Sequence, residues 1–203
     1  MKYSQFSIPN FQFKKVLLHS CCAPCSSAII EWMLKNGIRP TVFYYNPNIY
    51  PREEYEIRKA EAIRFVTAQG LDFVDADYDY EDWRKAVVGL EQEPERGKRC
   101  LQCFTLRLME TAKYGVEHGF EAFTTTLASS RWKSLEQINE AGRRAAEQYP
   151  GIVFWDQNWR KGGLQERRNQ LLKEYGFYNQ QYCGCEFSMQ RLQKNNEDTT
   201  CER

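Results

Sequence analysis

Long apolar segments are absent from this 203-residue sequence, and so is a strong excess of either charge. No apolar run approaches the length that a bilayer-spanning helix requires, which argues against a membrane protein. Residues 1–15 are polar and aromatic, and they lack the short apolar core of a secretory signal. The formal net charge of +1 gives no global field to attract nucleic acid or a membrane, so any basic surface has to be local. We therefore expect a cytoplasmic protein without a membrane partner.

The composition also disfavours a disulfide scaffold, although the sequence contains eight cysteines. In a reducing compartment, cysteines are more often metal ligands or redox groups than structural crosslinks. A disulfide framework distributes its cysteines over many loops, whereas most of these lie in three short clusters. The clusters are Cys21, Cys22 and Cys25; Cys100 and Cys103; and Cys183 and Cys185. Cys201 stands apart in a polar stretch, and no role is predicted for it.

Apolar segments of strand length alternate with helical patterns along the chain. Strands are expected at 15–19, 41–45, 71–74, 120–127 and 152–155. Helices are expected at 28–36, 51–69, 82–88, 101–118, 134–149 and 164–175, with Ser26 and Ser27 as caps of the first. This alternation predicts an α/β fold of three layers, a parallel sheet with helices on both faces.

The alternation also suggests how the chain is divided and where a ligand binds. We expect a flexible segment at 1–14, a single catalytic metal-binding domain at 15–190 and a disordered tail at 191–203. Ligands of parallel α/β folds bind beyond the carboxyl ends of the strands. The first cysteine cluster follows the first predicted strand, so it should lie in that position.

The spacing of the cysteines favours metal chemistry. Thiolates are soft ligands that suit zinc, copper(I) and iron–sulfur clusters. Cys100 and Cys103 can chelate one centre from a single helical turn, where the helix dipole favours thiolates. This pair alone would also fit half of a structural zinc site. The adjacent Cys21 and Cys22 cannot easily chelate one tetrahedral zinc but can reach different metals, which argues against a plain zinc site.

The third cluster, Cys183-Gly184-Cys185, is too compact for an ordinary structural crosslink. A disulfide between residues this close would be strained and easily reduced, which suits a redox role. The alternative is a further pair of metal ligands, with Gly184 permitting the tight turn. The spacing leaves both roles open.

Other candidate residues give weaker signals. His19 is best explained as a core residue, and His118 as a residue that caps a helix. Four tyrosines could stack on a nucleobase or belong to the core: Tyr44, Tyr45, Tyr50 and Tyr55. The segment 131–173 is basic, which indicates either solvated helix surface or phosphate contacts of an RNA site. Its cations are Arg131, Lys133, Arg143, Arg144, Arg160, Lys161, Arg167, Arg168 and Lys173.

Five motifs occur in a fixed order along the chain. They are HSCCAPC (19–25), FYYNPNIYPREEY (43–55), KRCLQCFTLRLMETA (98–112), FTTTLASSRWKSLEQINEAG (123–142) and YCGC (182–185). Together they closely resemble the QueH family of epoxyqueuosine reductases, from about residue 15 to about residue 190. The resemblance implies a cobalamin-independent oxidoreductase that reduces the epoxide of epoxyqueuosine, in the wobble position of a tRNA anticodon, to queuosine. It also implies an adenine-nucleotide-hydrolase-like (HUP-like) fold.

The resemblance further implies roles for the cysteines. A [4Fe–4S] cluster would be bound by Cys21, Cys22, Cys100 and Cys103, with an additional iron ion nearby. Cys183 and Cys185 match a redox-active pair, or ligands of the second iron. Cys25 would be a further metal ligand, at a place where some members have aspartate. The implied partners are tRNA carrying epoxyqueuosine and an electron donor such as a ferredoxin or flavodoxin.

Two other functions remain open at this point. An iron–sulfur tRNA thiolase that uses ATP would have a similar fold, but the loop after the first strand lacks a glycine-rich phosphate cradle. A zinc-stabilised RNA-binding module without catalysis would also explain clustered cysteines. Metal analysis and an ATP-binding titration distinguish these alternatives from an iron-dependent reductase.

Overall fold

The computed structural model describes residues 13–201, of which 194–201 are described by their backbone alone. One parallel sheet forms the centre of the fold, with the spatial order β3-β2-β1-β4-β5. Its strands are β1 (Val16–His19), β2 (Thr41–Tyr44), β3 (Phe73–Asp75), β4 (Ala122–Thr125) and β5 (Val153–Phe154). The register places Leu18 of β1 opposite Val42 of β2 and Thr124 of β4.

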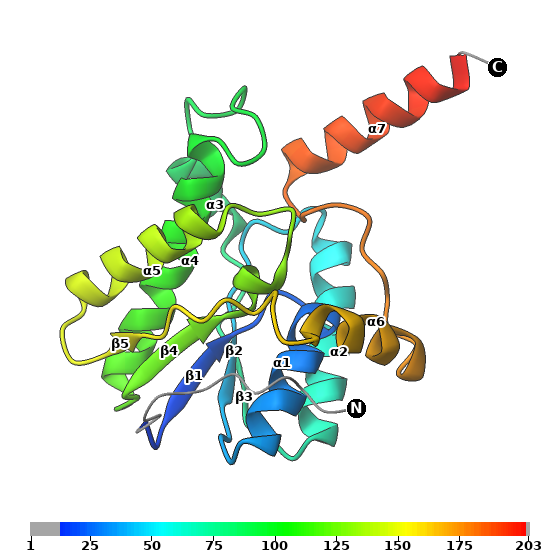
Figure 1. The fold of residues 1–203 in the computed structure, drawn as a ribbon. Helices are drawn as coiled ribbons and strands as arrows, with labels where there is room; N and C mark the ends of the chain where they lie inside the picture. The colour runs from blue at the N-terminus through cyan, green and yellow to red at the C-terminus, as the bar shows by residue number, and fades with distance from the viewer. Residues whose placement is uncertain (1–12, 202–203) are drawn as a thin grey trace.

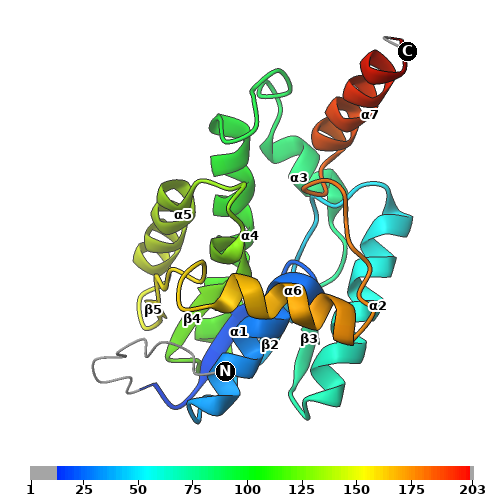
Figure 2. The ribbon, with the colours of Figure 1, turned by 45° about the vertical axis from the view of Figure 1, so that its right-hand side comes forward.

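Helices cover both faces of this sheet (Figures 1 and 2). One layer contains α1 (Ala23–Lys35), α2 (Arg52–Ala68) and α6 (Leu164–Glu174), and the other contains α4 (Lys98–Glu117) and α5 (Leu135–Gln148). Helices α3 (Tyr80–Ala86) and α7 (Glu186–Cys201) lie on the side of the carboxyl ends of the strands. The predicted three-layer α/β fold is confirmed, and the strand order is consistent with a HUP-like arrangement.

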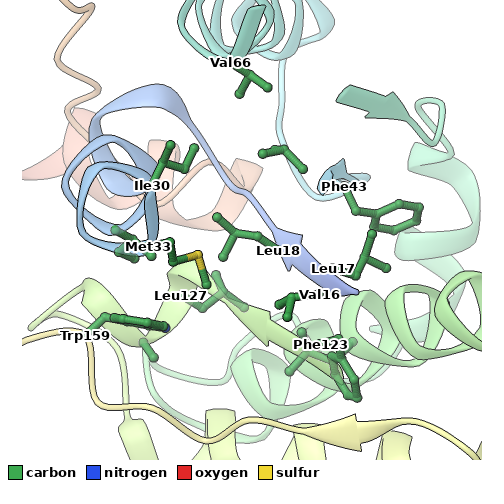
Figure 3. Packing of buried hydrophobic residues seen from close by; sticks show 14 of the residues in the cluster. Val16, Leu17, Leu18, Ile30, Met33, Phe43, Val66, Phe123, Leu127 and Trp159 are labelled. Atoms are coloured by element: carbon green, nitrogen blue, oxygen red, sulfur yellow. The ribbon is translucent and has the colours of Figure 1, made fainter. Parts of the chain in front are cut away.

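The core lies on both sides of β1, whose side chains alternate between the two helix layers (Figure 3). Leu17 and Leu18 are fully buried, and Leu18 points toward Ile30 of α1. On the other face, α4 approaches the sheet closely at Gly115, where a Cβ atom would lie 2.3 Å from Ile152. A larger residue there would require the Ile152 side chain to move.

Helix α1 begins earlier than the sequence suggests. Ser26 and Ser27 were expected to cap it, and this prediction is wrong because Cys22 is the N-cap residue and Pro24 lies in the first turn. Proline is favoured there because its fixed φ suits the helix and its missing N–H is not needed. The Ser26 hydroxyl instead donates back to the carbonyl of Cys22 at 3.0 Å. Cys25 is consequently a first-turn residue, close to the positive end of the helix dipole.

Two more boundaries differ from the expectation. Strand β4 ends at Thr125, and a 3₁₀ turn, η1 (Thr126–Ser129), follows where the sequence suggested a longer strand. Helix α7 runs to Cys201 and so spans 191–201 of the segment 191–203 that was expected to be a disordered tail, in a stretch without the proline or glycine that ends helices. The first twelve residues of the segment predicted to be flexible lie outside the described residues. Within residues 13–201, none of the helices combines the length and apolar character of a membrane span.

Candidate metal and redox centre

The site lies where the winding of the sheet reverses. From β1, the chain connects to β2 over one face, while β4 on the other side of β1 is entered and left over the opposite face. Such a switch point opens a crevice at the carboxyl ends of the strands. The loop after β1 carries Cys21, whose backbone N–H donates to Thr126 Oγ1 at 3.1 Å. The Thr126 hydroxyl in turn donates to Cys21 Sγ at 3.3 Å, so the thiol is fixed across the crevice.

Three thiols form a first group, the β1-loop trio of Cys21, Cys22 and Cys25. Their sulfur atoms all lie within 4.8 Å of one another, and the sulfurs of Cys21 and Cys22 are 3.8 Å apart. Cys22 is buried and also accepts a hydrogen bond from the side-chain amide of Gln180. Soft donors at this separation can hold a metal ion.

The protonation of the β1-loop trio is uneven. Hydrogen bonds from Cys22 and then Cys25 hold the pKa of Cys21 well below that of an ordinary thiol. Burial raises the pKa of Cys22 well above it, and the hydrogen bond to Cys21 raises the pKa of Cys25 to about 11. Of the three thiols, Cys21 is therefore the first to lose its proton. Because a metal binds thiolates, metal binding here would release protons from Cys22 and Cys25.

The remaining four clustered cysteines form a second group around the N-terminus of α4. Cys100 and Cys103 lie in the first two turns of that helix. The backbone N–H of Arg96 donates to Cys100 Sγ at 3.3 Å, and burial raises the pKa of Cys100 to about 11. Cys103 packs with Trp83 and Cys185 in a small apolar cluster. The four residues that the family resemblance assigns to one cluster are thus divided between the two groups.

The turn Cys183-Gly184-Cys185 lies directly before α7. Gly184 has φ +125°, a conformation that glycine adopts without strain, as the tight spacing suggested. Its carbonyl accepts a hydrogen bond from the Tyr50 N–H at 2.8 Å, and Arg58 donates to the carbonyl of Cys183 at 3.3 Å. Both thiols are free; Cys183 is exposed and Cys185 is half-buried. Contacts from α2 and from the segment before it therefore hold the turn in place.

A single cleft of about 530 Å³ connects the two groups. This volume lies within the usual range for sites that bind small molecules. Five of the clustered thiols line the cleft: Cys21, Cys25, Cys100, Cys183 and Cys185. Three segments that are far apart in the sequence thus present sulfur to the same space.

The walls of the cleft are strongly cationic. Its cations are Arg58, Arg96, Arg99, Arg107, Lys133, Arg168 and Arg191, and among the described lining residues Glu95 is the one carboxylate. Burial opposes the charge of Lys133, but the neighbouring cysteine side chains, Cys183 foremost, raise its pKa overall. Arg107 is buried and donates to Asn46 Oδ1, while its Nε atom has no partner among the described residues. The cleft is therefore suited to an anionic ligand.

The histidines play the structural roles expected from the sequence. His19 is fully buried, and its ring nitrogens form hydrogen bonds with Thr125 Oγ1 at 2.8 Å and the Tyr45 carbonyl at 3.2 Å. Burial, followed by the charge of Arg107, lowers the pKa of His19 to about 3, so the ring is neutral at physiological pH. His118 is the C-cap residue of α4. Both interpretations are confirmed.

Of the tyrosines considered for base stacking, Tyr44, Tyr45 and Tyr55 are buried in the core, whereas Tyr50 is partly exposed. The cations of segment 131–173 also differ from one another. Arg167 forms ion pairs with two carboxylates, and Arg144 with one on its own helix.

Three polar residues of the site were not identified from the sequence. Arg107 follows Cys103 by one helical turn, so helical spacing could have placed it on the same face of α4. Asn46 follows β2 and donates to the Ser20 carbonyl at 2.9 Å, a position at the carboxyl edge that strand prediction could have identified. The role of Gln180 could not be predicted from the sequence, because its contact with Cys22 of the β1-loop trio joins residues 158 positions apart.

The switch-point crevice and the thiol-lined cleft define an α/β protein with a candidate metal or redox centre. Its sequence relatives narrow this class. The chain belongs to the epoxyqueuosine reductase QueH family, whose model matches residues 16–191. It is 50% identical over 185 residues to Epoxyqueuosine reductase QueH of Haemophilus influenzae, covering 91% of this chain and 76% of that protein. The protein of the same name from Thermotoga maritima is 37% identical over 186 residues, 90% of this chain and 94% of that protein.

Proposed function

We propose that this protein is a cytoplasmic, cobalamin-independent oxidoreductase that reduces epoxyqueuosine in the tRNA wobble position to queuosine. The observation that carries the proposal is one cationic cleft lined by five thiols from three distant segments. The relatives of the chain named above are called epoxyqueuosine reductases, which agrees with such a site. The reaction consumes two electrons and two protons. Both C–O bonds of the epoxide break, a carbon–carbon double bond forms, and the oxygen leaves as water.

The thiols fit an iron–sulfur centre, because they are soft donors grouped at chelating distance and partly shielded from water. We assign Cys21, Cys22, Cys100 and Cys103 as cluster ligands and Cys25 as a further metal ligand. A [4Fe–4S] cluster bound there would supply single electrons, and an additional iron would act as a Lewis acid toward the epoxide oxygen. The electrons would come from a protein such as a ferredoxin or flavodoxin.

The chain itself contributes charge and redox groups. Lys133 and Arg107 are cations beside the thiols, so they would stabilise negative charge that develops on the epoxide oxygen. Cys183 and Cys185 would act either as a redox pair that accepts electrons from the donor or as ligands of the second iron. The exposure of Cys183 supports contact with an external donor.

The test is anaerobic purification followed by iron and sulfide analysis, a visible spectrum, and EPR of the reduced protein. The loaded protein is then incubated with tRNA carrying epoxyqueuosine and a chemical reductant, and mass spectrometry of the nucleosides measures the loss of one oxygen. A Cys201→Ser variant is a control, because this cysteine lies outside the three clusters of the sequence, and it should keep both iron and activity. Zinc in place of iron would contradict the proposed centre, and a loaded protein that leaves the nucleoside unchanged would contradict the substrate.

A further inference from the structure

An exposed tryptophan lies at the mouth of the cleft. Trp132 is 68% exposed, whereas indole rings usually bury most of their surface. Of the large hydrophobic side chains exposed within residues 13–193, Trp132 is the one that lines the cleft. Four of the five thiols that line the same cleft are half-buried, so the ring is more exposed to solvent than they are.

The backbone that carries this ring is held firmly. Arg96 donates through Nε to the Trp132 carbonyl at 2.9 Å and through Nη2 to the Arg131 carbonyl at 3.3 Å. The N–H of Trp132 donates to Ser130 Oγ at 3.3 Å, and Arg160 donates to the next carbonyl, that of Lys133, at 2.8 Å. The exposed ring is thus presented by a fixed loop.

The surroundings of the ring are cationic. The Arg131 guanidinium lies 4.9 Å from the Trp132 ring centroid, and Arg96 and Lys133 line the same cleft. An apolar protein partner would meet a ring surrounded by unneutralised charge. A single-stranded nucleic acid instead offers both a flat base for the ring and phosphates for the cations. The chain as a whole has a net charge of only +1, whereas the cleft lining contains seven cations and one carboxylate.

We propose that Trp132 is a stacking platform for a nucleobase next to the one that enters the cleft, with Arg131 and Arg96 placed to contact the adjoining phosphates. The inference rests on the proposed function, which supplies a single-stranded anticodon loop as the substrate. Stacking at the entrance fixes the position of the loop, and the modified base then reaches the thiols. Trp132 is accordingly a positioning residue and takes no part in the electron transfer.

The experiment measures binding separately from reaction. The probe is a fluorescein-labelled anticodon stem–loop RNA with guanine in the wobble position, which offers the same loop but has no epoxide to reduce. Fluorescence anisotropy gives its Kd for the metal-loaded wild type and for the variants Trp132→Ala, Trp132→Phe and Val88→Ala. Val88 is the matched control, because it is 73% exposed and lies outside the cleft lining. Thermal unfolding verifies that all four proteins are folded.

We expect Trp132→Ala to raise Kd roughly 10- to 100-fold, or about 1.4–2.8 kcal/mol, while the phenylalanine variant and Val88→Ala stay within about threefold. Because stacking releases no counterions, the plot of log Kd against log salt for Trp132→Ala should shift to higher Kd with the slope of the wild type. Removing the charge of Arg131 should reduce that slope by about 0.7. An alanine variant that binds as tightly as the wild type overturns the stacking role. If it does so while the wild type still reduces epoxyqueuosine in tRNA, the proposed function stands and only the stacking role is lost. A wild type that neither binds this RNA nor reduces epoxyqueuosine in tRNA overturns both.

Discussion

Replacing Arg58 with methionine tests the buried ion pair that anchors the Cys183–Cys185 turn. Arg58 Nη2 lies 2.6 Å from Glu54 Oε1, and the two side chains are 3% and 8% exposed. Arg58 also donates to the carbonyls of Tyr182 and Cys183, each at 3.3 Å. Methionine fills a similar volume without the charge, so the substitution leaves the Glu54 carboxylate buried without its cation.

The expected loss of stability is large. Removing one partner of a buried pair costs about 3–5 kcal/mol, because the remaining charge has lost its hydration without compensation. In a protein of this size each kcal/mol lowers Tm by roughly 2–4 °C, so Arg58→Met should lower Tm by roughly 6–20 °C. The pair Arg144–Glu140 is the control. Its side chains are 52% and 41% exposed, and its removal should cost at most about 1 kcal/mol.

Thermal unfolding followed by circular dichroism measures these changes, and a third variant tests their cause. In Glu54→Gln/Arg58→Met both charges are absent, and the Tyr178 hydroxyl, which donates to Glu54 Oε2 at 2.8 Å, can still donate to the glutamine. The double variant should therefore be more stable than Arg58→Met, although the lost bonds to the turn carbonyls prevent full recovery. A double variant no more stable than the single one would refute the argument from an uncompensated charge.

Three further outcomes are expected. Serine at Cys100 or at Cys103 should lower the cluster content and the epoxide reductase activity together, and full visible absorption in both variants would remove them from the ligand set. Serine at both Cys183 and Cys185 should lower iron with little change in sulfide if they are ligands of the second iron. If they are a redox pair, the double variant should keep its iron, complete one turnover from a pre-reduced cluster and then stop; normal iron with normal multiple turnover would exclude both roles. Charge removal at Arg168, which lines the cleft, should reduce the slope of log Kd for RNA against log salt by about 0.7, and an unchanged slope would assign it to solvated surface.

The strands could be predicted from the sequence because the information is local. Residues 41–45 are almost continuously β-branched or aromatic, and β2 occupies Thr41–Tyr44. The start of α1 could not be predicted in the same way. Ser26 and Ser27 are good capping residues, yet Pro24 also suits a first turn, and the two choices differ by one helical turn. In the structure the cysteine loop before α1 is held by Thr126 of η1, a contact between residues 105 positions apart that local propensities do not contain.

For the site, the sequence predicts the three cysteine clusters from their spacing but not how they meet. Convergence follows from the sheet order, which places the loop after β1 beside the turn after β4. The contacts that tune individual thiols, such as Gln180 with Cys22, join segments whose approach depends on the path of the chain after α6. The exposure of individual side chains could not be predicted either, since nothing in the sequence distinguishes the exposed Trp132 from the buried Trp159.

The order of the thiols along the chain has a consequence during translation. When Phe154 has been added, a nascent chain already contains every strand of the sheet and the first two cysteine clusters. Gln180, Cys183 and Cys185 are synthesised later, and they form one wall of the cleft. Until then the cleft lacks this wall, and the thiols of the first two clusters are not yet enclosed on that side. Formation of the sheet and completion of the cleft are therefore separate events during synthesis of this chain.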